Sequence, residues 1–261
     1  AKRARRDNFN FPSLVFFVWN TMKLSLLALF AGSAAAFTSS PAGKTSSALN
    51  SLAELEAIAE KSNPVLKFYD PLELSSTSIW GESNEATIAF LRHAEVKHGR
   101  VAMAAFVGYI AQSNGIHFPW PMTFDGTPFP SDAGSPPEQW DALPDAAKWQ
   151  IILFIGFLEW FSEAAGTHYM RGGTPGAFPK FSDHSELIPH PVPLNLFDPF
   201  GFSASASAEK KEIGLIKELN NGRAAMMGII GFLTEQKVEG SVPLLKGVVS
   251  HYDGEVMAPF A

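Results

Sequence analysis

The sequence contains no cysteine, and only 18% of its 261 residues are charged. Without cysteine the chain has no disulfide, thiolate metal site or cysteine nucleophile, so any metal ligand must be an oxygen or nitrogen atom. The charged fraction is below the roughly 25% that is usual in soluble domains. Hydrophobic residues make up 46%. This composition favours a membrane protein with few spans, because the mean hydropathy is only +0.04.

Charges of one sign are missing from two segments. No Asp or Glu occurs between residues 8 and 53, and no Lys or Arg occurs between residues 113 and 145. The net charge of −6, and the absence of a basic cluster from the later segments of the chain, argue against nucleic-acid binding. The sequence also lacks a phosphate-binding glycine loop, a nucleophile elbow and a metalloprotease helix, so it does not predict an enzyme.

The N-terminal segment without acidic residues predicts a targeting sequence. Met22 opens the stretch MKLSLLALFAGSAAAF, which has the basic start, apolar core and small-residue end of a signal peptide, and hydroxyl-rich residues follow. A signal peptide followed by such a hydroxyl-rich segment resembles the bipartite presequences of algal plastids. We therefore assign residues 22–53 to a presequence, 54–261 to the membrane domain and 1–21 to an upstream extension of unknown status. An N-terminal membrane anchor is the alternative, although its apolar core is short for a span.

Three later segments are expected to be membrane helices, from about residue 84 to 112, 146 to 165 and 211 to 234. The second has an apolar centre, IILFIGFL, whereas the others become apolar only after a Gly-Arg pair. Basic residues occur in the loop after the second segment but not in the loop after the first. The positive-inside rule then places the mature N-terminus on the stromal or cytoplasmic side. The alternative is that a proline-rich loop simply lacks basic residues.

The first and third segments share a motif. EVKHGRVAMAAFVG, which begins at Glu95, returns as ELNNGRAAMMGIIG, which begins at Glu218, and FYDPLEL and FDPFGF precede the two copies. The duplication predicts two helices that are related by a pseudo-twofold axis and cross each other, with the second segment outside the repeat. Small residues after the shared Gly-Arg pair are expected to let the helices approach. These residues are Ala102, Gly108, Ala225 and Gly231.

The same repeat predicts two ion pairs. Five residues turn a helix by about 140°, so Glu95 and Arg100 cannot easily neutralise each other. The pseudo-twofold axis instead pairs Glu95 with Arg223 and Glu218 with Arg100. An unpaired charge at the centre of a membrane helix costs roughly 2.5 to 3.5 kcal/mol, which favours this pairing.

His98 and Asn221 occupy the same position of the repeat. Each can offer one neutral lone pair, and each neutralised glutamate can offer a free oxygen. Such donors suit Mg²⁺ ions that arrive with their other coordination positions filled. The alternatives are a hydrogen-bonded structural histidine, a helix-start motif, or the ion path of a small membrane transporter.

The paired motifs E-x-x-H-x-R and E-x-x-N-x-R resemble those of the chlorophyll-binding light-harvesting superfamily, in particular its chlorophyll a/c branch with the fucoxanthin and peridinin antennae. This resemblance covers residues 68–261. It implies an all-α membrane protein with three transmembrane helices in the plastid thylakoid membrane. It also implies bound chlorophyll a, chlorophyll c and carotenoids (fucoxanthin or peridinin, with diadinoxanthin), and the transfer of excitation energy to a photosystem I or II core. Other antenna subunits and thylakoid lipids would be partners. A photoprotective, energy-quenching member is the alternative.

The resemblance also implies roles for particular residues. Those matching the family's chlorophyll magnesium ligands are Glu95, His98, Glu218 and Asn221, with Arg100 and Arg223 as the charge partners. Glu159 resembles a ligand of the second helix, Gln150 is a further candidate there, and Glu235 or Gln236 would ligate at the end of the third. The segments at Asp70 and Asp198 resemble the places where central carotenoids rest their ends, with turns as the alternative. His168 and His251 are expected to be structural or solvated.

Overall fold

The computed structural model describes residues 51–79, 81–130, 134–188, 190, 195–203, 205–256 and 258–260. The predicted upstream extension and nearly all of the predicted presequence lie outside the described residues. Within these ranges the regular structure is helical, as expected. The elements are α2 (Leu52–Ser62), η1 (Leu74–Ser76), α3 (Asn84–Ser113), α4 (Pro136–Asp141), α5 (Asp145–Ala164), η3 (Tyr169–Arg171), η4 (Phe181–Asp183) and α6 (Ala208–Lys237).

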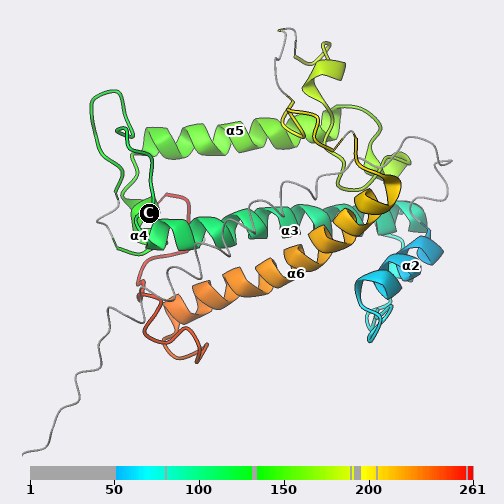
Figure 1. The fold of residues 1–261 in the computed structure, drawn as a ribbon, viewed down its shortest axis with the longest axis horizontal. Coiled ribbons are helices and arrows are strands. Elements are labelled where there is room, and N and C mark those ends of the chain that lie inside the picture. Colours follow the sequence, from blue (N-terminus) through cyan, green and yellow to red (C-terminus); the bar gives the residue numbers. More distant parts are fainter. Residues whose placement is uncertain are drawn as a thin grey trace, which may run out of the picture.

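Helices α3 and α6 form the centre of the fold and cross each other (Figure 1). Each has 30 residues and begins after a serine whose hydroxyl caps the first turn: Ser83 accepts from the Ala86 N–H, and Ser207 from the Lys210 N–H. Helix α6 starts three residues earlier than predicted, because the polar residues after Ser207 extend the helix beyond its apolar part. Among the described helices, none meets the length and hydropathy expected of a membrane span.

The two helices touch backbone to backbone at Gly99 and Gly222. A Cβ atom on Gly99 would lie 3.0 Å from the Gly222 Cα, and one on Gly222 would lie 2.9 Å from the Gly99 Cα. The prediction that Gly108 and Gly231 allow the approach is wrong. A Cβ on Gly108 would meet nothing within 4 Å, and one on Gly231 would meet only a leucine side chain, at 4.0 Å. Crossed helices separate on either side of one point, so close contact is confined to that point.

Aromatic rings fill the space where the helices separate. The ring of Phe232 on α6 stacks on both Phe106 and Tyr109 of α3, with centroids 5.1 and 4.8 Å apart. A Cβ on Gly228 would lie 2.7 Å from the Phe106 ring. The Tyr109 hydroxyl donates to Oε1 of Gln236 at 3.2 Å. This half of the crossing is therefore filled by side chains.

Helix α2, which the sequence did not predict, packs against α6 (Figure 1). The Asn220 side-chain amide donates to the Ser62 carbonyl at 3.0 Å, and Lys61 forms an ion pair with Glu212. Ser51 caps the first turn of the helix. Its 11 residues are too few to stand out in a search for long apolar segments.

Helix α5 lies on the side of α3 away from α6 (Figure 1), and near its C-terminal end Glu159 and Glu163 reach Lys97 of α3. Near its C-terminal end Phe161 is fully buried against the rings of Phe178 and Phe181, at centroid distances of 5.9 and 4.8 Å. Near its N-terminal end Lys148 is 1% exposed and donates to the Asp141 carbonyl at 3.3 Å. The two ends of α5 are thus held by the segments that flank it.

The C-terminal segment joins α4 to the end of α6. The Tyr252 hydroxyl donates to Oδ2 of Asp141 at 2.6 Å, and the Tyr252 N–H donates to the Gln236 carbonyl at 3.1 Å. The Trp140 indole donates to the Pro259 carbonyl at 2.9 Å. These contacts close the side of the fold opposite α2.

Replacing Tyr252 by phenylalanine (Y252F) is expected to lower the free energy of unfolding by about 1 kcal/mol, the usual net contribution of a hydrogen bond. The bond to Asp141 raises the pKa of Tyr252 to about 12. Because the raised pKa favours the neutral phenol in the folded state, the advantage over Y252F should be constant below about pH 10 and disappear towards pH 12. Thermal unfolding across this range measures it. Tyr69, which is 74% exposed, provides the control Y69F, and an equal loss in the control would contradict the prediction.

Candidate functional site

Two ion pairs flank the crossing point of α3 and α6. Nε of Arg223 donates to Oε1 of Glu95 at 2.7 Å, and Nε of Arg100 donates to Oε1 of Glu218 at 2.5 Å. Both pairs join the two helices as the repeat predicts. Each arginine directly follows the glycine of the backbone contact, Gly99 or Gly222. The close approach therefore brings each guanidinium within reach of the opposite carboxylate.

The two pairs are not equally covered by the chain. The Glu218 and Arg100 side chains are 6% and 24% exposed, whereas those of Glu95 and Arg223 are 32% and 44% exposed. Nη1 of Arg100 also donates to the carbonyl of Gly176, at 2.5 Å, in the segment after α5. The pseudo-symmetry of the sequence is therefore incomplete in the structure.

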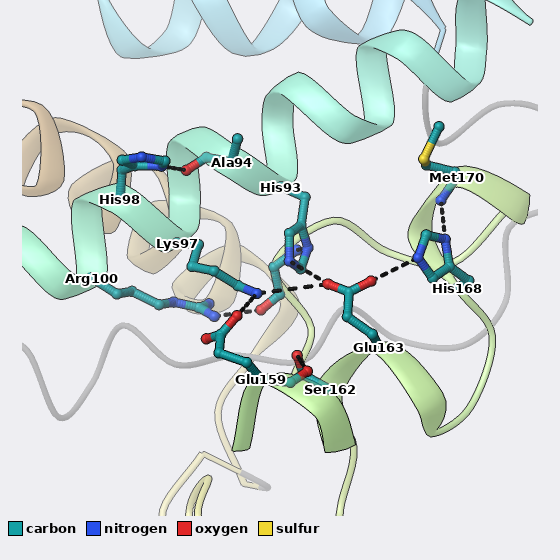
Figure 2. Close-up of polar contacts among 11 residues, drawn as sticks. His93, Ala94, Lys97, His98, Arg100, Glu159, Ser162, Glu163, His168 and Met170 are labelled. Atoms are coloured by element: carbon teal, nitrogen blue, oxygen red, sulfur yellow. Dashed lines mark hydrogen bonds and ion pairs between the residues drawn. The ribbon is translucent and has the colours of Figure 1, made fainter. Parts of the chain in front are cut away.

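His98 is oriented as a metal ligand would be. Its Nδ1 lies 2.7 Å from the Ala94 carbonyl oxygen, which can only accept, so Nδ1 carries the proton and Nε2 keeps its lone pair. The side chain is exposed and points away from the polar group around His93 (Figure 2). A ligating histidine typically donates its other N–H to a carbonyl in this way. Asn221, at the equivalent position of α6, is exposed as well.

His93, which the sequence did not single out, has the opposite tautomer. Its Nδ1 accepts from the N–H of Gly176 at 3.1 Å, so the proton lies on Nε2. The ring is 8% exposed and stacks on Tyr169 with centroids 3.9 Å apart. His93 therefore offers no lone pair to a metal and has a structural role.

A cluster of charged and polar side chains joins α3 to α5 (Figure 2). Nζ of Lys97 lies 2.5 Å from Oε2 of Glu159 and 3.7 Å from Oε1 of Glu163. Nδ1 of His168 accepts from the Met170 N–H, so its Nε2 donates to Oε2 of Glu163, at 2.7 Å. The predicted ligand Glu159 is thus neutralised by Lys97, and His168 has the expected structural role. Glu163 connects α3, the end of α5 and the segment that follows α5.

The remaining candidates differ in their surroundings. Gln150 is exposed on α5. Glu235 is 2% exposed, and its carboxylate accepts from the N–H groups of Gly240 at 2.8 Å and Val242 at 2.7 Å. The geometry gives Glu235 a role in holding the turn that follows α6.

The duplication extends into the segments before α3 and α6. The Asp70 carboxylate accepts from the Ser75 N–H at 2.8 Å, and the Asp198 carboxylate accepts from the Ser203 N–H at 2.9 Å. The Ser75 N–H lowers the pKa of Asp70, and the Ser203 hydroxyl, which also donates to Asp198, together with the Ser203 N–H lowers the pKa of Asp198. Both aspartates have the turn-forming role that was the alternative in the sequence analysis.

The arrangement of motif, crossing and ion pairs agrees with comparisons to known proteins. The family model "Chlorophyll A-B binding protein" matches residues 53–237. The chain belongs to this family. A fucoxanthin-chlorophyll a-c binding protein of Trieres chinensis is 37% identical over 86% of this chain and 98% of its own length. Proteins F and B of the same description from Phaeodactylum tricornutum are each 35% identical, over 83% and 87% of this chain and 96% and 100% of their own lengths. All three are named chloroplastic.

The chlorophyll A-B binding family match reaches from the start of α2 to the end of α6, so it includes both ion pairs and every candidate ligand. Sequence reasoning found the residues that the repeat writes twice. It missed His93, Lys97, Glu163 and Gly176, because their partners lie on α5 or in the segment after it, outside the repeat. The repeated glycine of the Gly-Arg pair was a signal for the crossing point, since it recurs beside each arginine.

Proposed function

We propose that the protein is a light-harvesting antenna that binds chlorophyll a, chlorophyll c and carotenoids, including fucoxanthin, and passes excitation energy to a photosystem. The observation that carries the proposal is the outward lone pair of His98 beside a carboxylate that is neutralised by an arginine. The relatives are named as fucoxanthin-chlorophyll a-c binding proteins, which supports the same pigments here.

The protein ligands of the chlorophyll magnesium ions are Glu95, His98, Glu218 and Asn221. Each glutamate uses one oxygen for its arginine, so the second can bind magnesium without adding net charge to the site. Glu159, paired with Lys97, fits the same description on α5. Gln150 and Glu235 complete the proposed set. At Glu235 the metal would share a carboxylate that already accepts backbone hydrogen bonds.

The bound pigments absorb the light, and the protein fixes their separation and orientation. The backbone contact at Gly99 and Gly222 sets the distance between α3 and α6, and the two ion pairs prevent one helix from sliding along the other. The ligands therefore keep fixed positions on a rigid pair of helices. Fixed geometry directs the excitation from one pigment to the next.

We place the protein in the thylakoid membrane, with α3, α5 and α6 as three membrane-spanning helices and the mature N-terminus on the stromal side. At 30 residues, α3 and α6 are each about 45 Å long, against roughly 30 Å of hydrocarbon, so their charged first turns can lie outside it. A photosystem I or II core, other antenna subunits and thylakoid lipids are the partners.

Reconstitution with chlorophyll a, chlorophyll c and fucoxanthin tests the function. Light absorbed by fucoxanthin should produce chlorophyll a fluorescence, and His98→Ala should remove about one chlorophyll while the protein still folds. His251, an exposed histidine paired with Asp253, provides the control H251A, which should keep every pigment. A folded but colourless protein would disprove the antenna function, and ion conduction by it would favour a transporter. An H98A protein with a full chlorophyll content would disprove the ligand.

A further inference from the structure

We propose that the Gly176 carbonyl orients Arg100 in its ion pair with Glu218, and that His93 holds Gly176 in place. The segment between α5 and α6 thereby positions Glu218 as a ligand. The inference rests on the proposed function, because it concerns the chlorophyll that Glu218 would bind. It assigns positioning roles to Gly176 and His93, which act on Glu218 through Arg100.

Both peptide groups of Gly176 contact α3. The Gly176 N–H donates to Nδ1 of His93 at 3.1 Å, and its carbonyl accepts from Nη1 of Arg100 at 2.5 Å. His93 and Arg100 are seven residues apart, which is about two helical turns, so they lie on one face of α3. One residue of the segment therefore bridges two side chains of the same helix face (Figure 2 shows His93 and Arg100 on this face).

Only glycine fits this position. The φ angle of Gly176 is +77°, in the left-handed region, and an added Cβ would lie 2.7 Å from Cγ1 of Val96. The Cβ would also lie 3.6 Å from Nη2 of Arg100. A side chain here would push the segment away from α3 and break the contacts that its peptide groups make.

His93 cannot turn to follow a displaced segment. The ring is stacked on Tyr169, nearly parallel at 13°, and it is 8% exposed. Its tautomer is fixed as well, because Nδ1 must be unprotonated to accept the Gly176 N–H. The imidazole therefore acts as a fixed acceptor that places the Gly176 carbonyl in front of the guanidinium.

The guanidinium of Arg100 is held at two of its nitrogens, Nε by Glu218 and Nη1 by Gly176. Two contacts orient the planar group, and its orientation determines which carboxylate oxygen remains for a metal. In the part of the chain that the structure describes, the guanidinium of Arg223 contacts a hydroxyl in place of a backbone carbonyl: its Nη1 donates to the Ser62 hydroxyl at 3.4 Å. A change at Gly176 should therefore affect the Glu218 site and spare the Glu95 site.

The test replaces Gly176 by alanine in the full chain and compares its pigments with two reference proteins, R100L/E218L and R223L/E95L. Each reference lacks one complete ion pair and identifies the absorption band of one chlorophyll. We expect G176A to lose at least half of the chlorophyll that is missing from R100L/E218L and to keep the other. Gly201 has a similar φ of +71° with nothing within 4 Å of a Cβ, so G201A controls for backbone strain and should keep both.

Further variants separate positioning from general damage. V96A should restore part of the lost chlorophyll in G176A, because it removes the atom nearest the new Cβ. If G176A does not fold, H93F decides, since it keeps an aromatic ring beside Tyr169 but removes the acceptor; we expect the same selective loss. The ¹⁵N shifts of His93 in the pigment-loaded protein should change in G176A and not in G201A.

A G176A or H93F protein that keeps the Glu218 chlorophyll, or that loses both chlorophylls equally while G201A keeps them, would overturn the inference. If R100L/E218L itself keeps every chlorophyll, the proposed ligand fails, and this inference fails with it. Failure of the ligand Glu218 is distinguished from failure of the Gly176 inference alone, because in the former case the reference protein R100L/E218L, and not only G176A, gives the unexpected spectrum.

Discussion

Replacing Arg100 by leucine (R100L) is expected to prevent stable assembly of the protein, whereas replacing Arg223 by leucine (R223L) should destabilise the protein less. R100L leaves Glu218 as an unpaired carboxylate that is only 6% exposed. Breaking a buried pair by removing one partner costs about 3–5 kcal/mol, against a total stability of about 5–15 kcal/mol. R223L leaves Glu95, whose side chain is 32% exposed, so the chain itself desolvates this carboxylate less than it desolvates Glu218.

Removing both members of the buried pair should restore much of the stability that R100L loses. R100L/E218L leaves no unpaired charge, and replacing a whole buried pair by apolar residues is often tolerated. Thermal unfolding of the four single variants R100L, E218L, R223L and E95L and of the two double variants gives the coupling energy of each pair. Equal losses in R100L and R223L would show that exposure does not separate the two pairs. An R100L protein as stable as the parent would contradict the charge-pairing argument altogether.

The sequence predicted the crossed ion pairs because a duplicated helix motif implies a symmetric arrangement of its two copies. Two copies of one helix motif, related by a pseudo-twofold axis, must face each other at equivalent residues, so Glu95 and Arg223 could be paired without knowing any distance. Their unequal burial was not predictable. It arises from α2 on one side and the segment with Gly176 on the other, and neither of these belongs to the repeat.

Contacts of α5 were beyond the same reasoning. Glu159 was identified by resemblance alone, and its pairing with Lys97 depends on how two unrelated helix faces meet. Glu235 shows a related difficulty, because its hydrogen bonds depend on the conformation of a turn five to seven residues away. The repeat pointed to His98 and not to His93, but the opposite tautomers of the two rings could be assigned only from their hydrogen-bond partners.

Alanine at Gly222 is expected to have the second largest effect, although it adds a single methyl group. The new Cβ would lie 2.9 Å from the Gly99 Cα, a backbone atom that cannot rotate away, so the helices must separate. Overpacking of this kind costs about 1–3 kcal/mol. Separation also lengthens the ion pairs beside it, which are 2.5 and 2.7 Å long. Thermal unfolding and chlorophyll content should therefore fall together.

Other glycines of the same helices provide a graded comparison for G222A. Gly108→Ala meets nothing within 4 Å and should be neutral or stabilising by up to about 1 kcal/mol, because alanine favours a helix more than glycine does. Gly228→Ala would meet the Phe106 ring at 2.7 Å, a side chain that can move, so its loss should be intermediate. The order of the three losses separates backbone contact from helix propensity. If G222A behaved like G108A, the helices could not be touching at Gly99, and the site would need another account of how the arginines reach their carboxylates.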